Sequence, residues 1–192
     1  MKVHPDSVHC TTFMDRRPLA MSQLLTTDRL ILREVREDDV TPMFLLIYHN
    51  PNVLKTFLAP YIEHLEDASI DSLLRYQELG KLIYIIEKRD THEVIGLILE
   101  QEQTIESIEV GYAIGEPFWN QGYATEVLQA VIEHLFHLEY QRVTAECFLE
   151  NAASAKVMEK CGMNRTDKSY EMEYFKQRHT VIEYEIYAGK DL

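Results

Sequence analysis

The sequence predicts one mixed α/β domain, in which a twisted, mostly antiparallel sheet of about seven strands is flanked by about four helices. Strand-like and amphipathic helical runs alternate from Leu30 onward, and no repeat or linker divides them. Three consecutive strand-like runs are joined by links too short for a crossover. We expect residues 1–22 to form a loose arm, because they lack periodicity, and residues 23–192 to form a single domain.

The first part of the domain predicts two helices beside an early strand. Leu30–Val35 is rich in strand-forming residues. The acidic residues that follow it favour the first turn of a helix over Glu37–Asn50, which an Asn-Pro pair ends. A second helix is predicted over Leu65–Leu79, since a glycine follows it directly.

The remaining chain predicts most of the sheet and two further helices. Three strand-like runs, Leu82–Glu87, Val94–Glu102 and Ile105–Ile114, are expected to be antiparallel neighbours. The later predicted elements are a helix at Gly122–Leu138, a strand at Arg142–Phe148, a helix at Asn151–Cys161, and strands near Met163–Tyr170 and Thr180–Tyr187.

Charge and composition exclude several classes of protein. The chain has 19 basic and 32 acidic residues, a formal net charge of −13, so we expect no nucleic-acid partner. An acidic surface does attract a cationic acceptor such as an amine. No run approaches the ~20 apolar residues of a membrane span, and no signal-peptide core is present. Three cysteines without paired spacing indicate a cytoplasmic protein, and His134 and His137 lack a third metal ligand.

The segment Trp119–Glu126 carries the clearest functional signal. It follows the strand-like run Ile108–Ile114 and opens an amphipathic helix. Small residues at Gly122 and Ala124 let a ligand approach the backbone closely. The free N–H groups of a first helical turn, with the positive end of the helix dipole behind them, favour a phosphate or pyrophosphate.

Three motifs in this order and spacing resemble the GNAT superfamily of acetyl-CoA-dependent N-acetyltransferases. They are Thr27–Arg33, Trp119–Glu126 and Asn151–Met163. The closest likeness is to the ribosomal-protein N-terminal (serine/alanine) acetyltransferase group. The resemblance implies a GNAT fold with a splayed acetyl-CoA cleft, acetyl-CoA as co-substrate, no metal, and a monomer or homodimer.

The same resemblance implies which residues bind the cofactor. The amides from Asn120 through Thr125 would hold the pyrophosphate, and the backbone of Tyr112–Ile114 would pair with the pantetheine arm like an added strand. Asn151 either contacts that arm or caps its helix. The expected cofactor-binding residues are therefore Tyr112, Ala113, Ile114, Asn120, Gln121, Gly122, Tyr123, Ala124, Thr125 and Asn151.

Two positions depart from the family pattern. Trp119 stands where Gln or Arg is usual, which removes a cation and leaves the amides and helix dipole as the main phosphate contacts. Met158 stands where many relatives place a Tyr that acts as general acid. Water, Tyr112 or Tyr170 could replace that acid. Lys156 is either a contact to the adenosine phosphates or a solvent-facing lysine.

Acetyl transfer to an amine requires a proton acceptor, because a primary amine is mostly protonated at neutral pH. Glu109 is the predicted base, since strand alternation places it on the same face as Gly111 and Ala113, whose small side chains would leave room for an acceptor. Glu106 is the alternative base. We expect the acceptor pocket to be built by the two early helices and the final strand pair.

The acceptor itself stays open between a protein N-terminus, a polyamine and a small amine such as an antibiotic. Two other functions remain: a catalytically silent acyl-CoA sensor, and transfer of a longer acyl group.

Overall fold

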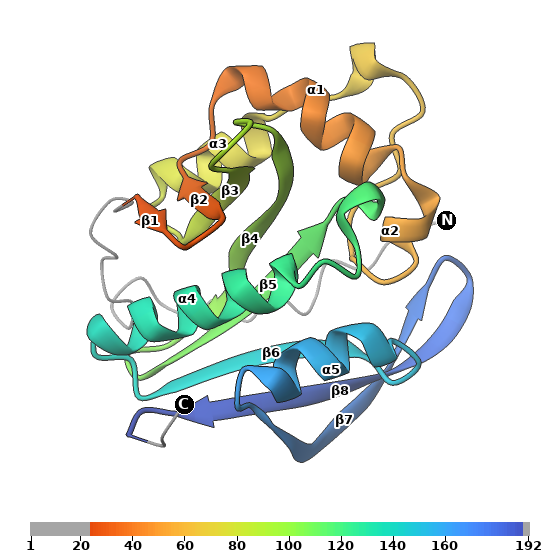
Figure 1. Cartoon of the computed structure of the whole chain (residues 1–192). Coiled ribbons are helices and arrows are strands. Elements are labelled where there is room, and N and C mark those ends of the chain that lie inside the picture. Colours follow the sequence, from red (N-terminus) through yellow and green to blue (C-terminus); the bar gives the residue numbers. More distant parts are fainter. Residues whose placement is uncertain (1–23, 190–192) are drawn as a thin grey trace.

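The computed structural model of the protein describes residues 24–189, so the predicted arm at 1–22 lies outside the described residues. One sheet of eight strands runs through it in the order β1-β2-β3-β4-β5-β6-β8-β7 (Figure 1). The strands are β1 (Leu25–Thr26), β2 (Leu30–Arg33), β3 (Ile83–Lys88), β4 (Val94–Gln103), β5 (Ser107–Ile114), β6 (Arg142–Phe148), β7 (Asn164–Tyr174) and β8 (Gln177–Tyr187). The additional strand relative to the prediction is the two-residue β1.

The helices lie on both faces of this sheet. They are η1 (Glu37–Asp39), α1 (Val40–Met43), η2 (Phe44–Tyr48), α2 (Pro51–Leu54), η3 (Leu65–Asp67), α3 (Asp71–Glu78), η4 (Glu116–Phe118), α4 (Tyr123–His137) and α5 (Ala152–Lys160). Among residues 24–189, no helix is both long and apolar enough to cross a bilayer.

One strand pair interrupts an otherwise antiparallel sheet. β5 and β6 run parallel and pair over only three residues each, Ser107–Glu109 against Arg142–Thr144. The predicted antiparallel neighbours β3, β4 and β5 are confirmed. Beyond Glu109 the two central strands separate, as Figure 1 shows to the right of α4. This separation matches the splayed opening that the family resemblance implies.

Alternation along β5 divides the core into two layers. Ile108, Val110 and Ile114 pack into a cluster with the apolar face of α4 and with buried residues of β6 and β8. Ala113 faces the other cluster, which includes Met43 and other residues of the N-terminal helices. Residues 109, 111 and 113 therefore share one face of β5, as predicted, and this face carries the N-terminal helices.

The two early helices differ from their predicted form. The predicted helix over Glu37–Asn50 is a continuous helical run made of three short segments, η1, α1 and η2, and it ends at Tyr48. The Asn-Pro pair does end it, but the same pair also begins α2. The side chain of Asn50 accepts hydrogen bonds from the amides of Asn52 and Val53, and Pro51 occupies the first turn.

The second predicted helix, Leu65–Leu79, is shorter than expected. Ala68 is extended and separates the single turn η3 from α3. The hydroxyl of Ser69 accepts a hydrogen bond of 3.0 Å from the Asp71 amide, so the helix proper begins at Asp71. The last two strands extend further than predicted, and β6 has the predicted bounds.

A buried ion network fixes the end of β2. The Arg33 guanidinium donates to Asp39 at 2.7 and 2.8 Å and to Glu87 at 2.6 Å. Because all three side chains are nearly fully buried, the pairing compensates the cost of removing these charges from water. The network ties the start of the N-terminal helices to the sheet.

Candidate active site

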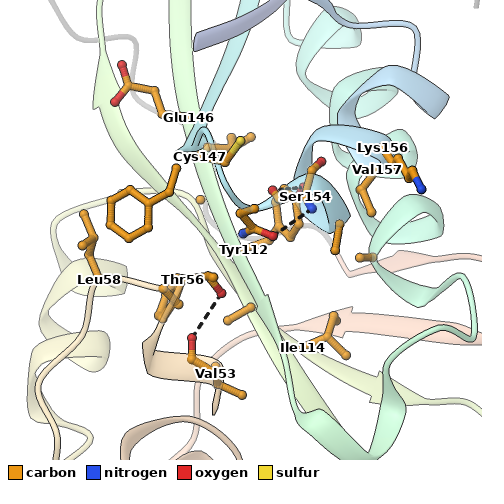
Figure 2. A pocket seen from close by; sticks show the side chains of 18 of the residues that line it. Val53, Thr56, Leu58, Tyr112, Ile114, Glu146, Cys147, Ser154, Lys156 and Val157 are labelled. Atoms are coloured by element: carbon orange, nitrogen blue, oxygen red, sulfur yellow. Dashed lines mark hydrogen bonds between the residues drawn. The ribbon is translucent and has the colours of Figure 1, made fainter. Parts of the chain in front are cut away.

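The separation of β5 and β6 opens a cleft of about 1370 Å³. Its walls come from β5, the turn before α4, the first turn of α4, β6, α5 and the segment 52–58. Figure 2 shows side chains converging on this space, with Leu58 and Thr56 on one side and Ser154, Lys156 and Val157 on the other. Pockets for drug-sized ligands commonly measure about 300–1,000 Å³. The cleft is therefore large enough for a ligand bigger than a typical drug.

The turn before α4 exposes backbone donors to the cleft. Asn120 and Gly122 adopt positive φ angles of 59° and 82°, which turn the chain sharply into the helix. No side chain caps this helix, and its first backbone bond runs from the Glu126 amide to the Gly122 carbonyl at 3.1 Å. Among residues 24–189, the amides of 122–125 have no protein acceptor. Their geometry suits a phosphate group.

An arginine that sequence reasoning missed lies beside this turn. Arg29 donates to the Gln121 carbonyl at 2.9 Å, and its guanidinium stacks over the Tyr123 ring at 4.5 Å. It also forms a salt bridge of 2.6 Å with Glu126, which accepts a further bond from Thr27. Two motifs nearly 100 residues apart are thus joined, and the Arg29 charge is already balanced by a carboxylate.

These hydrogen bonds also set the ionisation of Glu126. Partial burial raises the pKa of its carboxyl, but the bonds from Thr27 and Arg29 outweigh that effect. The net pKa lies below the ordinary value, so Glu126 is ionised at neutral pH. It therefore fixes the turn as a charged partner and does not act as a proton donor.

Trp119 does not take the place of the missing cation. Its indole N–H donates to the Ile114 carbonyl at 2.6 Å, which holds the ring against the end of β5. That carbonyl is one of the backbone groups predicted to pair with the pantetheine arm. The tryptophan therefore closes one end of the strand edge that faces the cleft.

The backbone of β5 alternates between its two neighbours. The Gly115 amide donates to Ile95 of the strand next to it, so the backbone groups of Ala113 point toward β4 and those of Tyr112 and Ile114 toward the cleft. The backbone N–H and C=O of Tyr112 therefore face the cleft, and neither is hydrogen-bonded to Trp119. Ala113 lines the cleft without offering it backbone bonds.

The space above Gly111 is filled, which differs from the prediction that small residues leave room there. A Cβ on Gly111 would lie 2.7 Å from the Gln101 amide nitrogen, so the Gln101 side chain occupies that volume. A second glycine, Gly96, was not singled out from the sequence. Its Cβ would lie 2.1 Å from the Ala113 carbonyl oxygen, so only glycine permits β4 to approach β5 there.

Glu109 lies at the fork, in the last pair before the strands separate. Its half-buried side chain lines the cleft. Burial raises the pKa of its carboxyl to about 7, and the negative charges of Glu146 and Glu102 add to the effect. A carboxyl with a pKa near the working pH suits a general base. The alternative base, Glu106, is exposed and does not line the cleft.

Two tyrosines were considered as proton donors. The Tyr112 hydroxyl shares a hydrogen bond of 2.9 Å with the Ser154 hydroxyl, and Figure 2 shows this pair inside the cleft. Burial raises the pKa of Tyr112, so the phenol keeps its proton. The Tyr170 hydroxyl donates to Glu146 at 2.6 Å instead. Met158 is fully buried in the core and contributes no polar group.

Asn151 begins α5 as a cap. Its side-chain oxygen accepts the Ser154 amide at 3.2 Å, which confirms the capping role. The other end of the helix reaches α4, where the Cys161 thiol donates to the Thr125 carbonyl at 3.4 Å. α5 therefore runs along the cleft from the middle of β5 to the first turn of α4.

The far end of the cleft is built by α2 and the β7–β8 hairpin. Tyr174 donates from its hydroxyl to the Phe57 and Ala59 carbonyls at 3.1 and 3.2 Å. Phe148 stacks on His179 with centroids 4.3 Å apart. The final strand pair contributes as predicted, but the helices over 37–50 and 65–79 do not line the cleft.

Comparisons with known proteins match this architecture. The profile of the acetyltransferase (GNAT) domain family matches residues 29–164. The uncharacterized N-acetyltransferase YoaA of Bacillus subtilis (strain 168) is 31% identical over 178 residues, covering 88% of this chain and 97% of the relative. The chain belongs to the GNAT acetyltransferase family.

Solved structures of this family have the same fold. RimL, a ribosomal L7/L12 alpha-N-protein acetyltransferase in complex with coenzyme A, superposes with a TM-score of 0.70 at 22% identity, covering 86% of this chain and 98% of that one. The microcin C7 self-immunity acetyltransferase MccE, in complex with acetyl-CoA and AMP, gives 0.71 at 18% identity, covering 84% and 93%. The predicted GNAT fold and the assignment as an acetyl-CoA-dependent acetyltransferase are confirmed.

Proposed function

We propose that this GNAT acetyltransferase transfers the acetyl group of acetyl-CoA directly to a primary amine while both are bound in the cleft. The position of Glu109 carries the proposal: a carboxyl with a pKa of about 7 at the fork of β5 and β6. The cleft extends from the turn before α4 to the segment after α2, which gives the cofactor and the amine separate walls to contact. Direct transfer needs no covalent enzyme intermediate.

The residues of the phosphate turn and of β5 fit the cofactor. The unpaired amides of 122–125, with Asn120 and Gln121 shaping the turn, would hold the diphosphate. The cleft-facing backbone of Tyr112 would pair with the pantetheine arm, beside Ala113, Ile114 and Asn151. Bound there, acetyl-CoA supplies an activated thioester carbonyl.

Glu109 removes the proton that the attacking amine must lose. About half of its carboxyls are ionised at pH 7, because its pKa is about 7. The same elevated pKa makes it a better proton acceptor than an exposed carboxylate. The cleft-facing N–H of Tyr112 is placed to donate to the carbonyl oxygen as it gains negative charge.

The Tyr112–Ser154 pair would donate a proton to the CoA thiolate as the carbon–sulfur bond breaks, and the phenol would then regain a proton from water. The two hydroxyls, one from β5 and one from the first turn of α5, are 2.9 Å apart, and both residues line the cleft that would hold the cofactor arm. Tyr112 was one of the acids suggested by the sequence, and Ser154 adds a second hydroxyl to the route. The reaction therefore does not require an acidic side chain at position 158.

The first acceptor to test is a protein N-terminus. RimL is described as an alpha-N-protein acetyltransferase, which supports that class, whereas MccE is described as a self-immunity enzyme against microcin C7 and supports small amines. We also place the reaction in the cytoplasm, because Cys147 and Cys161 are free, as in a reducing compartment.

A thiol-release assay with acetyl-CoA and a panel of peptides, polyamines and drugs that contain a primary amine tests this proposal. Turnover with one class, lost in Glu109→Gln while CoA binding persists, is the expected result. The catalytically silent sensor is the alternative, favoured only by the buried Met158. Cofactor binding without turnover on any amine would select the sensor.

A further inference from the structure

Coenzyme A carries three phosphates, and the phosphate turn accounts for only two of them. The diphosphate fits the amides at the start of α4. The third phosphate, on the ribose 3′ position, is a monoester with a charge of about −1.5 to −2 near pH 7. A protein with a net charge of −13 must supply local cations to hold it.

The cations nearest the turn are not available for this task. Trp119 replaces the usual Gln or Arg and donates to the Ile114 carbonyl. Arg29 is paired with Glu126 at 2.6 Å. The turn therefore offers backbone dipoles but no unbalanced positive charge.

Four lysines line the cleft, and two of them are engaged elsewhere. Lys168 forms ion pairs with Glu146 and Glu183 at 3.3 and 2.9 Å. Lys55 donates to the Asn52 side chain at 3.0 Å, and Asn52 in turn donates to the Glu116 carboxylate at 2.8 Å. Both lysines are therefore already hydrogen-bonded within the protein.

The other two lysines are Lys156 and Lys160, one helical turn apart on α5. Both line the cleft, both are exposed, and among residues 24–189 neither is in an ion pair. Spacing of four residues places them on one face of the helix. Figure 2 shows Lys156 projecting from α5 on the side away from Leu58.

The end of α5 brings this lysine face to the phosphate turn. Cys161, next to Lys160, donates to the carbonyl of Thr125 at 3.4 Å, in the first turn of α4. A group that leaves the turn toward solvent therefore passes the two lysines. Long flexible ammonium side chains suit a phosphate at a solvent-exposed edge.

We infer that Lys156 and Lys160 bind the 3′-phosphate of coenzyme A and make this enzyme selective for the phosphorylated cofactor. The inference rests on the proposed placement of the cofactor in the cleft. The positive charge that many relatives carry at the position of Trp119 would here be supplied by the two lysines of α5.

Calorimetric titration with CoA and with 3′-dephospho-CoA tests this inference without any turnover. The wild-type protein is expected to bind CoA about tenfold more tightly than the dephosphorylated form. The double variant Lys156→Gln/Lys160→Gln is expected to bind both ligands equally, at the wild-type affinity for 3′-dephospho-CoA. Higher salt should weaken CoA binding more in the wild type than in the double variant.

Lys55→Gln is the matched control, since this lysine also lines the cleft but lies at the end of α2 instead of on α5 and is hydrogen-bonded to Asn52, so its loss should leave both affinities unchanged. Equal loss of affinity for both ligands in the double variant, or no preference in the wild type, would overturn the inference alone. A wild-type protein that binds neither ligand would overturn the proposed function as well.

Discussion

Replacing Glu109 with glutamine should abolish most activity while making the protein more stable at alkaline pH. The pKa of this carboxyl rises from 4.5 to about 7 on folding, mainly through burial and then through Glu146 and Glu102. Glutamine keeps the shape of the side chain but cannot accept the proton. Loss of a general base commonly costs about 10²- to 10⁴-fold in kcat/KM.

The wild-type pH profile should report the same group. With a pKa of about 7, about one-tenth of the carboxyls are ionised at pH 6 and about nine-tenths at pH 8. The acid limb of kcat/KM should therefore rise about tenfold between these values. Glu146→Gln removes a negative neighbour, lowers the pKa of Glu109 and should move that limb to lower pH, whereas the exposed Glu106→Gln should not.

Stability should change in the opposite sense. Because the folded state holds this proton more tightly, the contribution of Glu109 is fully present below about pH 4.5 and is lost as pH rises through about 7. The loss is on the order of 3 kcal/mol at pH 8. Thermal unfolding of Glu109→Gln should therefore show a Tm several degrees above wild type at pH 8 and near wild type at pH 5. A variant that keeps wild-type turnover, or that gains no stability at pH 8, would refute the reasoning.

Three further variants test the geometry around the cleft. Gly122→Ala places a Cβ at a φ of 82°, so unfolding should show a loss of about 1–2 kcal/mol and titration a weaker affinity for CoA. Glu126→Gln breaks the salt bridge to Arg29 and should lower Tm by a few degrees, with less effect at high salt; an unchanged Tm would mean that the bridge is not stabilising. Tyr174→Phe removes the bonds to two carbonyls of the loop after α2 and should raise the acceptor KM severalfold while CoA affinity stays the same. Equal changes in both constants would show that Tyr174 acts on the whole fold.

Local signals predicted the second half of the fold well. The strand Arg142–Phe148 has the predicted bounds, and α4 differs from its prediction by one residue at each end. Asn151 caps its helix by accepting a hydrogen bond from the amide of Ser154, three residues later. Each of these features depends on neighbours within a few residues, which a single sequence displays directly.

The features that the sequence did not predict depend on residues with two roles or on partners far away in the chain. The Asn-Pro pair ends one helix and starts α2, and our prediction used only the first role, although Asn before Pro is also typical of a helix start. The partner of Arg29 is Glu126, 97 residues away, and no periodicity reports such a pairing. The pKa of Glu109 could not be predicted either, because it depends on burial in the folded cleft and on Glu146 and Glu102, which approach from other strands.

The three-residue seam between β5 and β6 has a mechanical consequence. With only three paired residues on each strand, the two halves of the sheet share few hydrogen bonds next to the proposed cofactor site. A cofactor that forms hydrogen bonds with the free edge of β5 and also contacts β6 and α5 would connect the two halves. Amide exchange should then slow on both sides of the seam upon binding, far beyond the residues that touch the ligand, so that occupancy sets the rigidity of the entire molecule.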